Sequence, residues 1–521
     1  MLEWITQDEE DPDEPTGKPA SATALLASLR GAEPAFALQE LGLWLDSAKD
    51  APSAEPGPQA KSEVLALLQE GGAAHVAALQ AQYLANTRGT RVAREAAWKS
   101  LVQYQSRLAR ALCASAGALF TAQSAARALS ACRTLAKLHL VHYASVPGKL
   151  WHVAYSIHAS AEKAGCSTAP VHAHSDHRTK TTVEQELLRL LMLRVSAPDM
   201  MAPEQIEVAD RVVDQLGAEF TLRQPGVADN PFCFEPGSEF APRRAKGRQA
   251  GDTTRFFGPG MGYDSLERIA RQLGAARLED FKAFGKDIAP GVQLSTVQHL
   301  LTFWRVDCPY SPPAHAAASG ALQVVHGYGQ IWQYLSQARH GAGELSLADS
   351  SAGVPQPPET WELRGAGGTE LGAQVPQASG AWVKCGGVVG LSVRDGGGRW
   401  VGIIRRMHAR PDGGLQADVA VLSREPRAQS LREVLEMGED SVFSNASSRQ
   451  FAFSGANAVI LADGAEGSQP ANLLLQPEHW KEGRTYETQG EEPTRFLRGL
   501  QVVRRGEDYV RATFEWVSRP G

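Results

Sequence analysis

The sequence predicts a multidomain protein in which a helical N-terminal half is followed by antiparallel β-domains. Its 521 residues exceed what one hydrophobic core accommodates, since domains contain about 100–200 residues. Apolar residues recur at steps of three and four up to about residue 300, which is typical of helices. After residue 320, short runs of alternating apolar residues stand between glycine-containing turns, which indicates a small β-barrel and then a second β-module.

The helical half divides into three parts. Residues 1–20 are acidic and contain proline, so we expect a flexible lead-in. Residues 21–145 are rich in alanine and leucine and predict a helical domain, in which Pro52–Pro58 separates two helices. Residues 146–305 predict a second helical region, with a loop at Asn230–Thr253. Its expected helices are Leu150–Gly165, Val183–Val195, Pro203–Leu216, Tyr263–Leu273 and Ser295–Phe303.

The β-part predicts a barrel at residues 320–428 and a second barrel-like module at residues 440–521. The strands expected in the first are Ala381–Lys384, Val388–Val393, Trp400–Arg405 and Leu415–Leu422. The side chains expected to face its interior are Val401, Ile403, Leu415, Val419 and Val421. A short helix is expected at Ser430–Glu436. The strands expected in the second are Phe451–Phe453, Ala458–Leu461, Asn472–Leu475, Arg484–Glu487, Phe496–Val503 and Tyr509–Val517.

Charge and cysteine usage exclude several classes of protein. The net charge is −6 and the pI is about 6.2, which excludes the basic footprint of a general nucleic-acid binder. The six cysteines include no CxxC pair, so neither a disulfide framework nor a thiolate zinc site is expected. The chain opens acidic rather than with a basic and then apolar segment, and no long apolar run follows. We therefore expect a cytoplasmic protein without membrane insertion.

The only sequence-local metal candidate is the histidine cluster from His172 to His177, which includes His174 and Asp176. Its spacing matches no zinc pattern, and a solvated loop is the favoured interpretation, so no metal is expected. No GxSxG, HExxH or Walker motif is present, and we expect no enzyme and no cofactor. A metal-dependent enzyme that uses this cluster is the distant alternative.

Arg405 and Arg406, with Arg410 nearby, stand at the end of an expected strand. A guanidinium binds phosphate through two parallel hydrogen bonds and stacks on bases, so two arginines on a barrel rim suit a nucleotide diphosphate. The alternative is a solvated strand end, which is the more common role of such a pair.

Three segments of the C-terminal half resemble PilZ domains of a long proteobacterial type. They are Trp361–Gly367, Trp400–Arg406 and Ala417–Leu422, and the leucine-rich helix that ends before Pro198 is similar to that type as well. The resemblance implies a helical region, a PilZ-like barrel and a further β-module. It also implies cyclic di-GMP as the ligand, held by an RxxxR segment before the barrel and a D/N-x-S-x-x-G motif on an early strand.

The chain departs from that pattern at most positions. In the segment before the barrel, Arg305 has no second arginine four residues later. The second motif aligns with Gly365, Gly367 and Glu370 in place of Asp/Asn, Ser and Gly. Each charge-assisted contact contributes roughly 1.5–3 kcal/mol, so losing three or four lowers affinity by several decades. Binding in the usual mode is therefore not expected, and Arg405, Arg406 and Arg364 remain as the candidate contacts.

These patterns predict a non-catalytic signalling adaptor or regulator with a degenerate PilZ-like barrel that acts through an unidentified protein partner. The alternative is a cyclic di-GMP-binding effector that uses a non-standard site. The candidate ligand-binding residues for that alternative are Arg305, Arg364, Arg405, Arg406 and Arg410.

Overall fold

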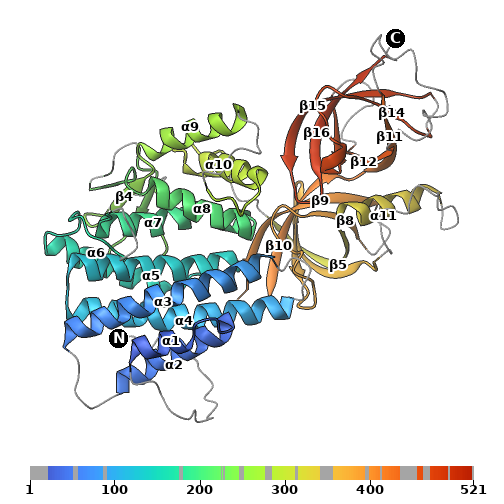
Figure 1. Ribbon diagram of the computed structural model, residues 1–521. Coiled ribbons are helices and arrows are strands. Elements are labelled where there is room, and N and C mark those ends of the chain that lie inside the picture. Colours follow the sequence, from blue (N-terminus) through green and yellow to red (C-terminus); the bar gives the residue numbers. More distant parts are fainter. Residues whose placement is uncertain are drawn as a thin grey trace, which may run out of the picture. The chain divides into compact units, whose positions relative to one another are not determined.

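The protein consists of two compact units, Met1–Ser311 and Pro312–Gly521, and the predicted order of helices before β-structure is confirmed (Figure 1). The domain boundaries predicted within them stay predictions. The computed structural model describes residues 21–50, 57–85, 91–174, 180–224, 226, 229–245, 251–275, 284–310, 315–340, 356–393, 398–410, 414–434, 455–461, 470–490 and 493–518.

The first unit is built from helices that share one hydrophobic core. Figure 1 shows α3, α4 and α5 side by side, with α7 and α8 following. Pro52–Pro58 separates two helices as predicted, because α2 ends at Asp50 and α3 begins at Pro58. The helices are α1 (Ala22–Ser28), α2 (Pro34–Asp50), α3 (Pro58–Ala85), α4 (Arg91–Ala118), α5 (Ala122–Val141), α6 (Gly148–Lys163), α7 (Val183–Val195), α8 (Pro203–Leu216), α9 (Gly262–Ala275) and α10 (Pro290–Trp304).

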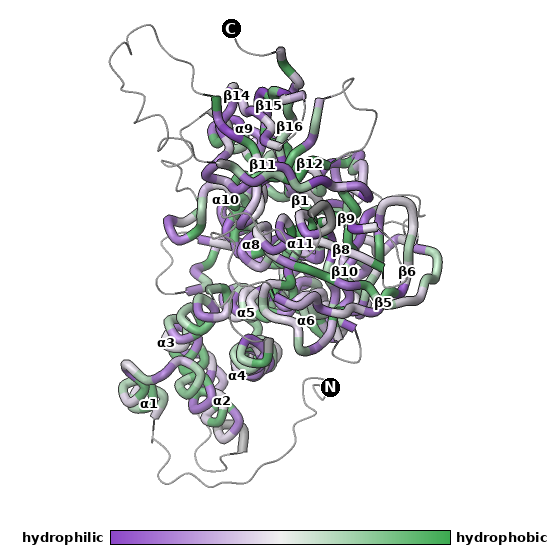
Figure 2. Tube along the Cα trace, turned by 90° about the vertical axis from the view of Figure 1, so that its right-hand side faces the viewer, coloured by the Kyte–Doolittle hydropathy of each residue, from purple (hydrophilic) through white to green (hydrophobic). Residues whose placement is uncertain are grey.

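Local signals fix the ends of these helices. The Thr121 side chain accepts a hydrogen bond from the backbone N–H of Ser124 and caps the N-terminus of α5. Thr182 caps α7 in the same way by accepting from Gln185. Hydrophilic and hydrophobic residues interleave along the coils of α1 and α2 in Figure 2, as expected for helices with one face on a core. No helix in the described residues is long and apolar enough to cross a bilayer.

A buried ion network joins α5 to α8. Lys137 Nζ lies 3.0 Å from carboxylate oxygens of both Glu207 and Asp210, and Arg133 Nη1 lies 3.3 Å from Asp210 Oδ1. Burial alone would raise the pKa of Asp210, but the charges of Lys137 and Arg133 outweigh it and the pKa is lowered. Removing one partner would leave an unpaired buried charge, so these charges fix how the two helices pack.

The expectation that residues up to about 300 are almost wholly helical is wrong in one region. A four-stranded sheet in the order β1-β4-β2-β3 occupies part of the predicted loop and its flanks. Its strands are two to four residues long, too short to show a period of two. They are held by aromatic packing, since Phe234 stacks on Tyr155 of α6 at 4.6 Å. The strands are β1 (Thr221–Arg223), β2 (Phe232–Phe234), β3 (Arg243–Arg244) and β4 (Arg255–Gly258).

The second unit contains two closed antiparallel barrels of six strands each. The first closes in the order β10-β7-β6-β5-β8-β9, and the predicted strand Val388–Val393 coincides with β8. Its strands are β5 (Ala316–His326), β6 (Glu359–Gly367), β7 (Glu370–Val375), β8 (Val388–Val393), β9 (Arg399–Ala409) and β10 (Leu415–Ser423). The predicted strand Ala381–Lys384 is wrong, because these residues form turns before β8.

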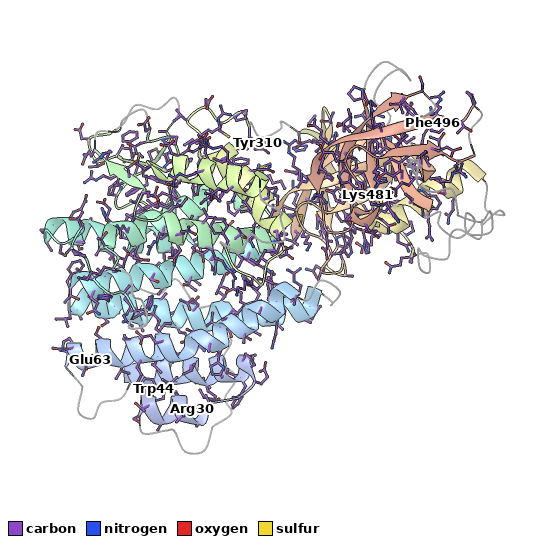
Figure 3. The ribbon with its side chains drawn as sticks, turned by 45° about the horizontal axis from the view of Figure 1, so that its top comes forward. Arg30, Trp44, Glu63, Tyr310, Lys481 and Phe496 are labelled. Atoms are coloured by element: carbon purple, nitrogen blue, oxygen red, sulfur yellow. The ribbon has the colours of Figure 1, made fainter. Side chains whose placement is uncertain are left out.

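The second barrel closes in the order β11-β12-β13-β16-β15-β14. Its side chains, among them Lys481 and Phe496, are drawn in Figure 3. The helix predicted at Ser430–Glu436 is wrong, because β11 (Arg427–Val434) pairs with two neighbours there and closes the barrel. The predicted strand Phe451–Phe453 lies outside the described residues. The other strands are β12 (Gly455–Leu461), β13 (Ala471–Leu475), β14 (Thr485–Thr488), β15 (Phe496–Arg505) and β16 (Val510–Val517).

Helix α11 (Tyr328–His340), which the sequence did not predict, packs between the barrels. The Tyr328 hydroxyl donates to the backbone carbonyl of Leu474 at 3.0 Å, and Ile331 is fully buried beside residues of both barrels. Val401 and Ile403 are buried, but in this helix cluster and not in the barrel interior as predicted. Gly402 faces the interior between them, where an added Cβ would lie 2.7 Å from Val419 Cγ1.

Replacing Lys137 by Met should destabilise the first unit by roughly 3–5 kcal/mol, because the carboxylates of Glu207 and Asp210 lose their buried partner. Urea unfolding of the whole chain measures the change. The control is Lys99→Met, which removes an exposed i,i+4 pair with Glu95 and should change stability by less than about 0.5 kcal/mol. Equal effects of the two substitutions would contradict the role given to the network.

The stabilisation from Asp210 should depend on pH. Its folded-state pKa is lowered, so the stabilisation is present above the unfolded value near 3.9 and is lost as pH falls through the folded value. The difference in unfolding free energy between wild type and Asp210→Asn should therefore be largest near neutral pH and shrink below about pH 4. A difference that stays constant down to pH 3 would show that Asp210 is not held ionised by its partners.

Ile403→Ala should cost roughly 2–5 kcal/mol, because the methyl groups lost are enclosed between β9 and α11. The control is Leu500→Ala on β15, whose side chain is exposed, and it should change stability by about 0.5 kcal/mol or less. Urea unfolding checks both variants. A cost for Ile403→Ala no larger than that of the control would place Ile403 outside a packed core.

Candidate ligand-binding face of the first barrel

Polar side chains gather on the outer surface of the first barrel, over four neighbouring strands. Along β7 and β10, Leu371, Ala373, Ala417 and Val419 are buried, and the residues between them point outward as period two requires. We call the resulting outward set the polar face. Its members are Glu362 and Arg364 on β6, Glu370, Gly372 and Gln374 on β7, Gln416 and Asp418 on β10, Arg405 and Arg406 on β9, Arg410 directly after β9, and His315 before β5.

Gln374 ties two of the arginines together. Its Oε1 accepts a hydrogen bond from Arg364 Nη2 at 3.0 Å and another from Arg410 Nη1. Arg364 also lies 2.7 Å from Glu362 on its own strand, and its side chain is half exposed. The two guanidinium groups therefore approach one another from β6 and from the end of β9 through one shared acceptor. Because Gln374 is neutral, it adds no negative charge between them.

Glu370 pairs with Arg405 across the same face. Arg405 Nη1 lies 3.0 Å from Glu370 Oε1, and the carboxylate is largely buried whereas 43% of the arginine side chain is exposed. Arg405 stands at a β-bulge, because the ladder with β10 shifts between Ile404 and Arg406. The bulge points Arg405 and Arg406 to the barrel surface one after the other. Arg405, a candidate phosphate contact, thus neutralises the carboxylate that stands at the position of the motif glycine.

Two glycines form a flat floor on this face. Gly365 and Gly372 are partners in the ladder between β6 and β7, and neither carries a side chain. An added Cβ at Gly365 would lie 2.9 Å from His315 Cβ, so the imidazole side chain lies against this pair. An added Cβ at Gly372 would lie 3.5 Å from Asp418 Oδ1 and 3.7 Å from Gln416 Nε2. Three polar side chains therefore converge on Gly372.

Arg305 belongs to the first unit and not to the barrel that carries the polar face. It follows α10 in the first unit and pairs with Asp307, with 2.9 Å between Arg305 Nη2 and Asp307 Oδ2. Hydrogen bonding to Arg305 lowers the pKa of Asp307. Both side chains are exposed, and the pair is a local surface contact. Pro312 and Pro313, in the segment before the barrel, lie outside the described residues.

The structure thus brings Arg364, Arg405, Arg406 and Arg410 onto neighbouring strands, together with the three motif positions. Gly365 pairs with Gly372, and Gly367 pairs with Glu370 in the ladder between β6 and β7. Whether these residues bind a ligand stays a prediction. Sequence reasoning missed His315, Gln374 and Gly372 as members of the set. A signal existed for Asp418 and Gln416, because they occupy the polar positions of an otherwise alternating apolar strand.

The histidine cluster near residue 174 gives no metal site within the described residues. His174 Nε2 lies 3.1 Å from Ser130 Oγ, and the backbone carbonyl of His172 accepts from Gln123. No group of three or more histidine, cysteine, aspartate or glutamate side chains suited to a metal occurs in the described parts of the chain. Asp176 and His177 lie outside those parts, so the absence of a metal stays a prediction.

The comparisons connect the helical half to a signalling receptor. Residues 20–226 match the family model for the N-terminal domain of the cyclic-di-GMP receptor FimW. The matched region covers less than half of the chain and extends from α1 through α8 to β1. Neither the search of curated proteins nor the search of solved structures gave a match. The similarity is therefore to one domain of a receptor, and it does not include either barrel.

Proposed function

We propose that this chain is a non-catalytic cyclic di-GMP effector that binds the nucleotide on the polar face of the first barrel. The observation that carries the proposal is the match of residues 20–226 to the N-terminal domain of a cyclic-di-GMP receptor. In this chain, a helical domain similar to that of a receptor is followed by two barrels. This combination favours a protein that senses the nucleotide over one whose barrel no longer binds it. The degenerate PilZ-like character of the first barrel remains part of this proposal.

The charges of the polar face support an anionic ligand. Four arginines stand there against three carboxylates, Glu362, Glu370 and Asp418. A dinucleotide with two phosphates can replace the carboxylate partners of Arg364 and Arg405, whose side chains are about half exposed and accessible. Phosphate suits the planar guanidinium fork. The Arg405–Glu370 pair then acts as an internal competitor, and the nucleotide binds by exchanging one partner for another.

A protein–protein adaptor is the competing function, and it was the first expectation from the sequence. The departures at Gly365 and Gly367 favour it, because those positions lack the side chains of the usual motif. The receptor match favours ligand binding, and the arginines of β6 and β9 offer it a non-standard site. In either case the helical unit would pass the signal to a protein partner. Nucleotide binding by the whole chain separates the two functions.

Isothermal titration of the whole chain with cyclic di-GMP should show saturable binding. Arg405→Ala should weaken it by roughly 10- to 100-fold, because a charge-assisted contact to phosphate is lost. Glu370→Gln should strengthen it by a similar order, because Arg405 loses the competing carboxylate. Raising the salt concentration should weaken binding to the wild type, since the contact is electrostatic.

Arg305→Ala is the matched control, because it removes the same side chain from the first unit and should leave the affinity within about twofold. Absence of binding by the wild type would support the adaptor instead. Tight binding that survives Arg405→Ala and Arg406→Ala would keep the ligand but refute the site.

A further inference from the structure

Asp418 is an unusual carboxylate for the surface of a barrel. Its side chain is only 6% exposed, and its Oδ1 has no hydrogen-bond partner among the described residues. The His315 imidazole lies beside it, with 3.8 Å between His315 Nε2 and Asp418 Oδ1, beyond hydrogen-bond range. A buried oxygen left without a donor is costly, so a group that supplies donors there would be stabilised.

The imidazole beside it is equally unsatisfied. Neither ring nitrogen of His315 has a hydrogen-bond partner among the described residues. The ring covers the floor made by Gly365 and Gly372 and belongs to the segment immediately before β5. Within the described residues, the ring makes no hydrogen bond that would have to be broken for it to leave. A planar group with matching donors can therefore take its place on the floor.

The groups around this floor have a definite hydrogen-bonding pattern. Asp418 offers two carboxylate acceptors, and Gln416, two residues earlier on β10, has an amide donor 3.7 Å from an added Cβ at Gly372. One edge of guanine presents O6, N1–H and the N2 amino group in a row, an acceptor followed by two donors. The corresponding edge of adenine presents an amino donor and the N1 acceptor, which would face the carboxylate with a lone pair.

We propose that one guanine base of the nucleotide displaces the His315 imidazole, lies on the Gly365–Gly372 floor, and is recognised by Asp418. The base donates N1–H and N2–H to the carboxylate, and Gln416 donates to O6. This inference rests on the proposed function and identifies the residues that select the base. It also explains how a barrel with glycine at the usual Asp/Asn position reads guanine. The carboxylate is supplied by β10, whose Asp418 is the ladder partner of Gly372.

The competing explanation is structural: Asp418 and His315 hold the segment before β5 on the barrel and select no base. The two explanations differ in what happens when the base itself is altered. Cyclic di-IMP lacks the N2 amino group of cyclic di-GMP but keeps both phosphates. If Asp418 accepts from N2, the wild type should discriminate between the two nucleotides, and a variant that lacks one of the two acceptors should discriminate less.

The experiment is titration of the whole chain with cyclic di-GMP, cyclic di-IMP and cyclic di-AMP. The wild type should prefer cyclic di-GMP to cyclic di-IMP by about tenfold or more. In Asp418→Asn, one of the two acceptors becomes a donor, which would face N1–H or N2–H, so binding of cyclic di-GMP should fall about 10- to 100-fold and that preference should decrease. Its preference over cyclic di-AMP should also decrease. Glu425→Gln is the control, because it removes one exposed carboxylate just beyond β10 and should change neither value.

A second variant guards against misfolding of Asp418→Asn. Gly372→Ala adds a methyl group at ordinary contact distance from its neighbours, so the barrel should keep its thermal stability. The methyl group would lift the base from the floor and weaken binding by about tenfold or more. His315→Ala should strengthen binding, because the imidazole no longer competes for the floor.

The outcomes separate the two levels of the proposal. Binding of cyclic di-GMP by the wild type with unchanged affinity and preference in Asp418→Asn would overturn the base-reading role and leave the proposed function standing. The same holds if Asp418→Asn fails to fold and Gly372→Ala binds like the wild type. A wild type that binds none of the nucleotides would overturn the proposed function, and the base-reading role with it.

Discussion

Closure of the first barrel is the constraint on which its candidate site depends. Because each of the six strands pairs on both sides, the register of one strand fixes the face on which every residue of the next must lie. The buried set of β10, which includes Ala417 and Val419, therefore leaves Gln416 and Asp418 no place but the outside. Where two consecutive residues, Arg405 and Arg406, stand on that outside, the ladder contains a bulge.

The order of helices before strands could be predicted from the sequence, because apolar residues recur with a different period in long helices than in alternating strands. Val183–Val195 and Val388–Val393 were predicted with the bounds that the structure has. The elements that failed are decided by distant partners. β11 has the composition of a short helix, yet Leu431 is fully buried between β12 and β14, and pairing with those strands outweighs local propensity. No local pattern reports a pairing partner that lies tens of residues away.

Of the candidate site, only the arginines could be predicted from the sequence, because partners on other strands leave no local pattern. Arginine pairs are visible in a sequence, whereas their neighbours on other strands are not. Glu370 stands where the motif has glycine, and only the structure shows that its partner is Arg405. Gln374 and Asp418 drew no attention as site residues because a lone polar residue in a strand usually faces solvent. The burial of Asp418 and the contacts of these two residues with Gly372 and Arg364 arise only when β6, β7 and β10 lie together.

Pairing of the arginines with protein carboxylates also constrains how such a site would behave. A site whose cations already have partners binds a phosphate by exchange, so its net gain is the difference between two ion pairs, far smaller than either. Such a site binds moderately and releases readily, which suits a sensor more than a store.

The position of Arg405 gives that exchange a route out of the barrel. Ile404, its neighbour, exchanges backbone hydrogen bonds with Gly386 and Gly387 at 2.7 and 2.9 Å. The carbonyl of Gly386 in turn accepts from the hydroxyl of Tyr509, which belongs to the second barrel, at 3.0 Å. Tyr509 is fully buried in the cluster around α11, so a shift of the bulge at Arg405 would displace packed side chains there and not exposed ones.

Contiguity alone does not transmit a signal, since coupling requires an element with two arrangements. If the proposed nucleotide binds, the side chain of Arg405 would leave Glu370 for a phosphate, and the bulge that carries Arg405 would be the element with a second arrangement.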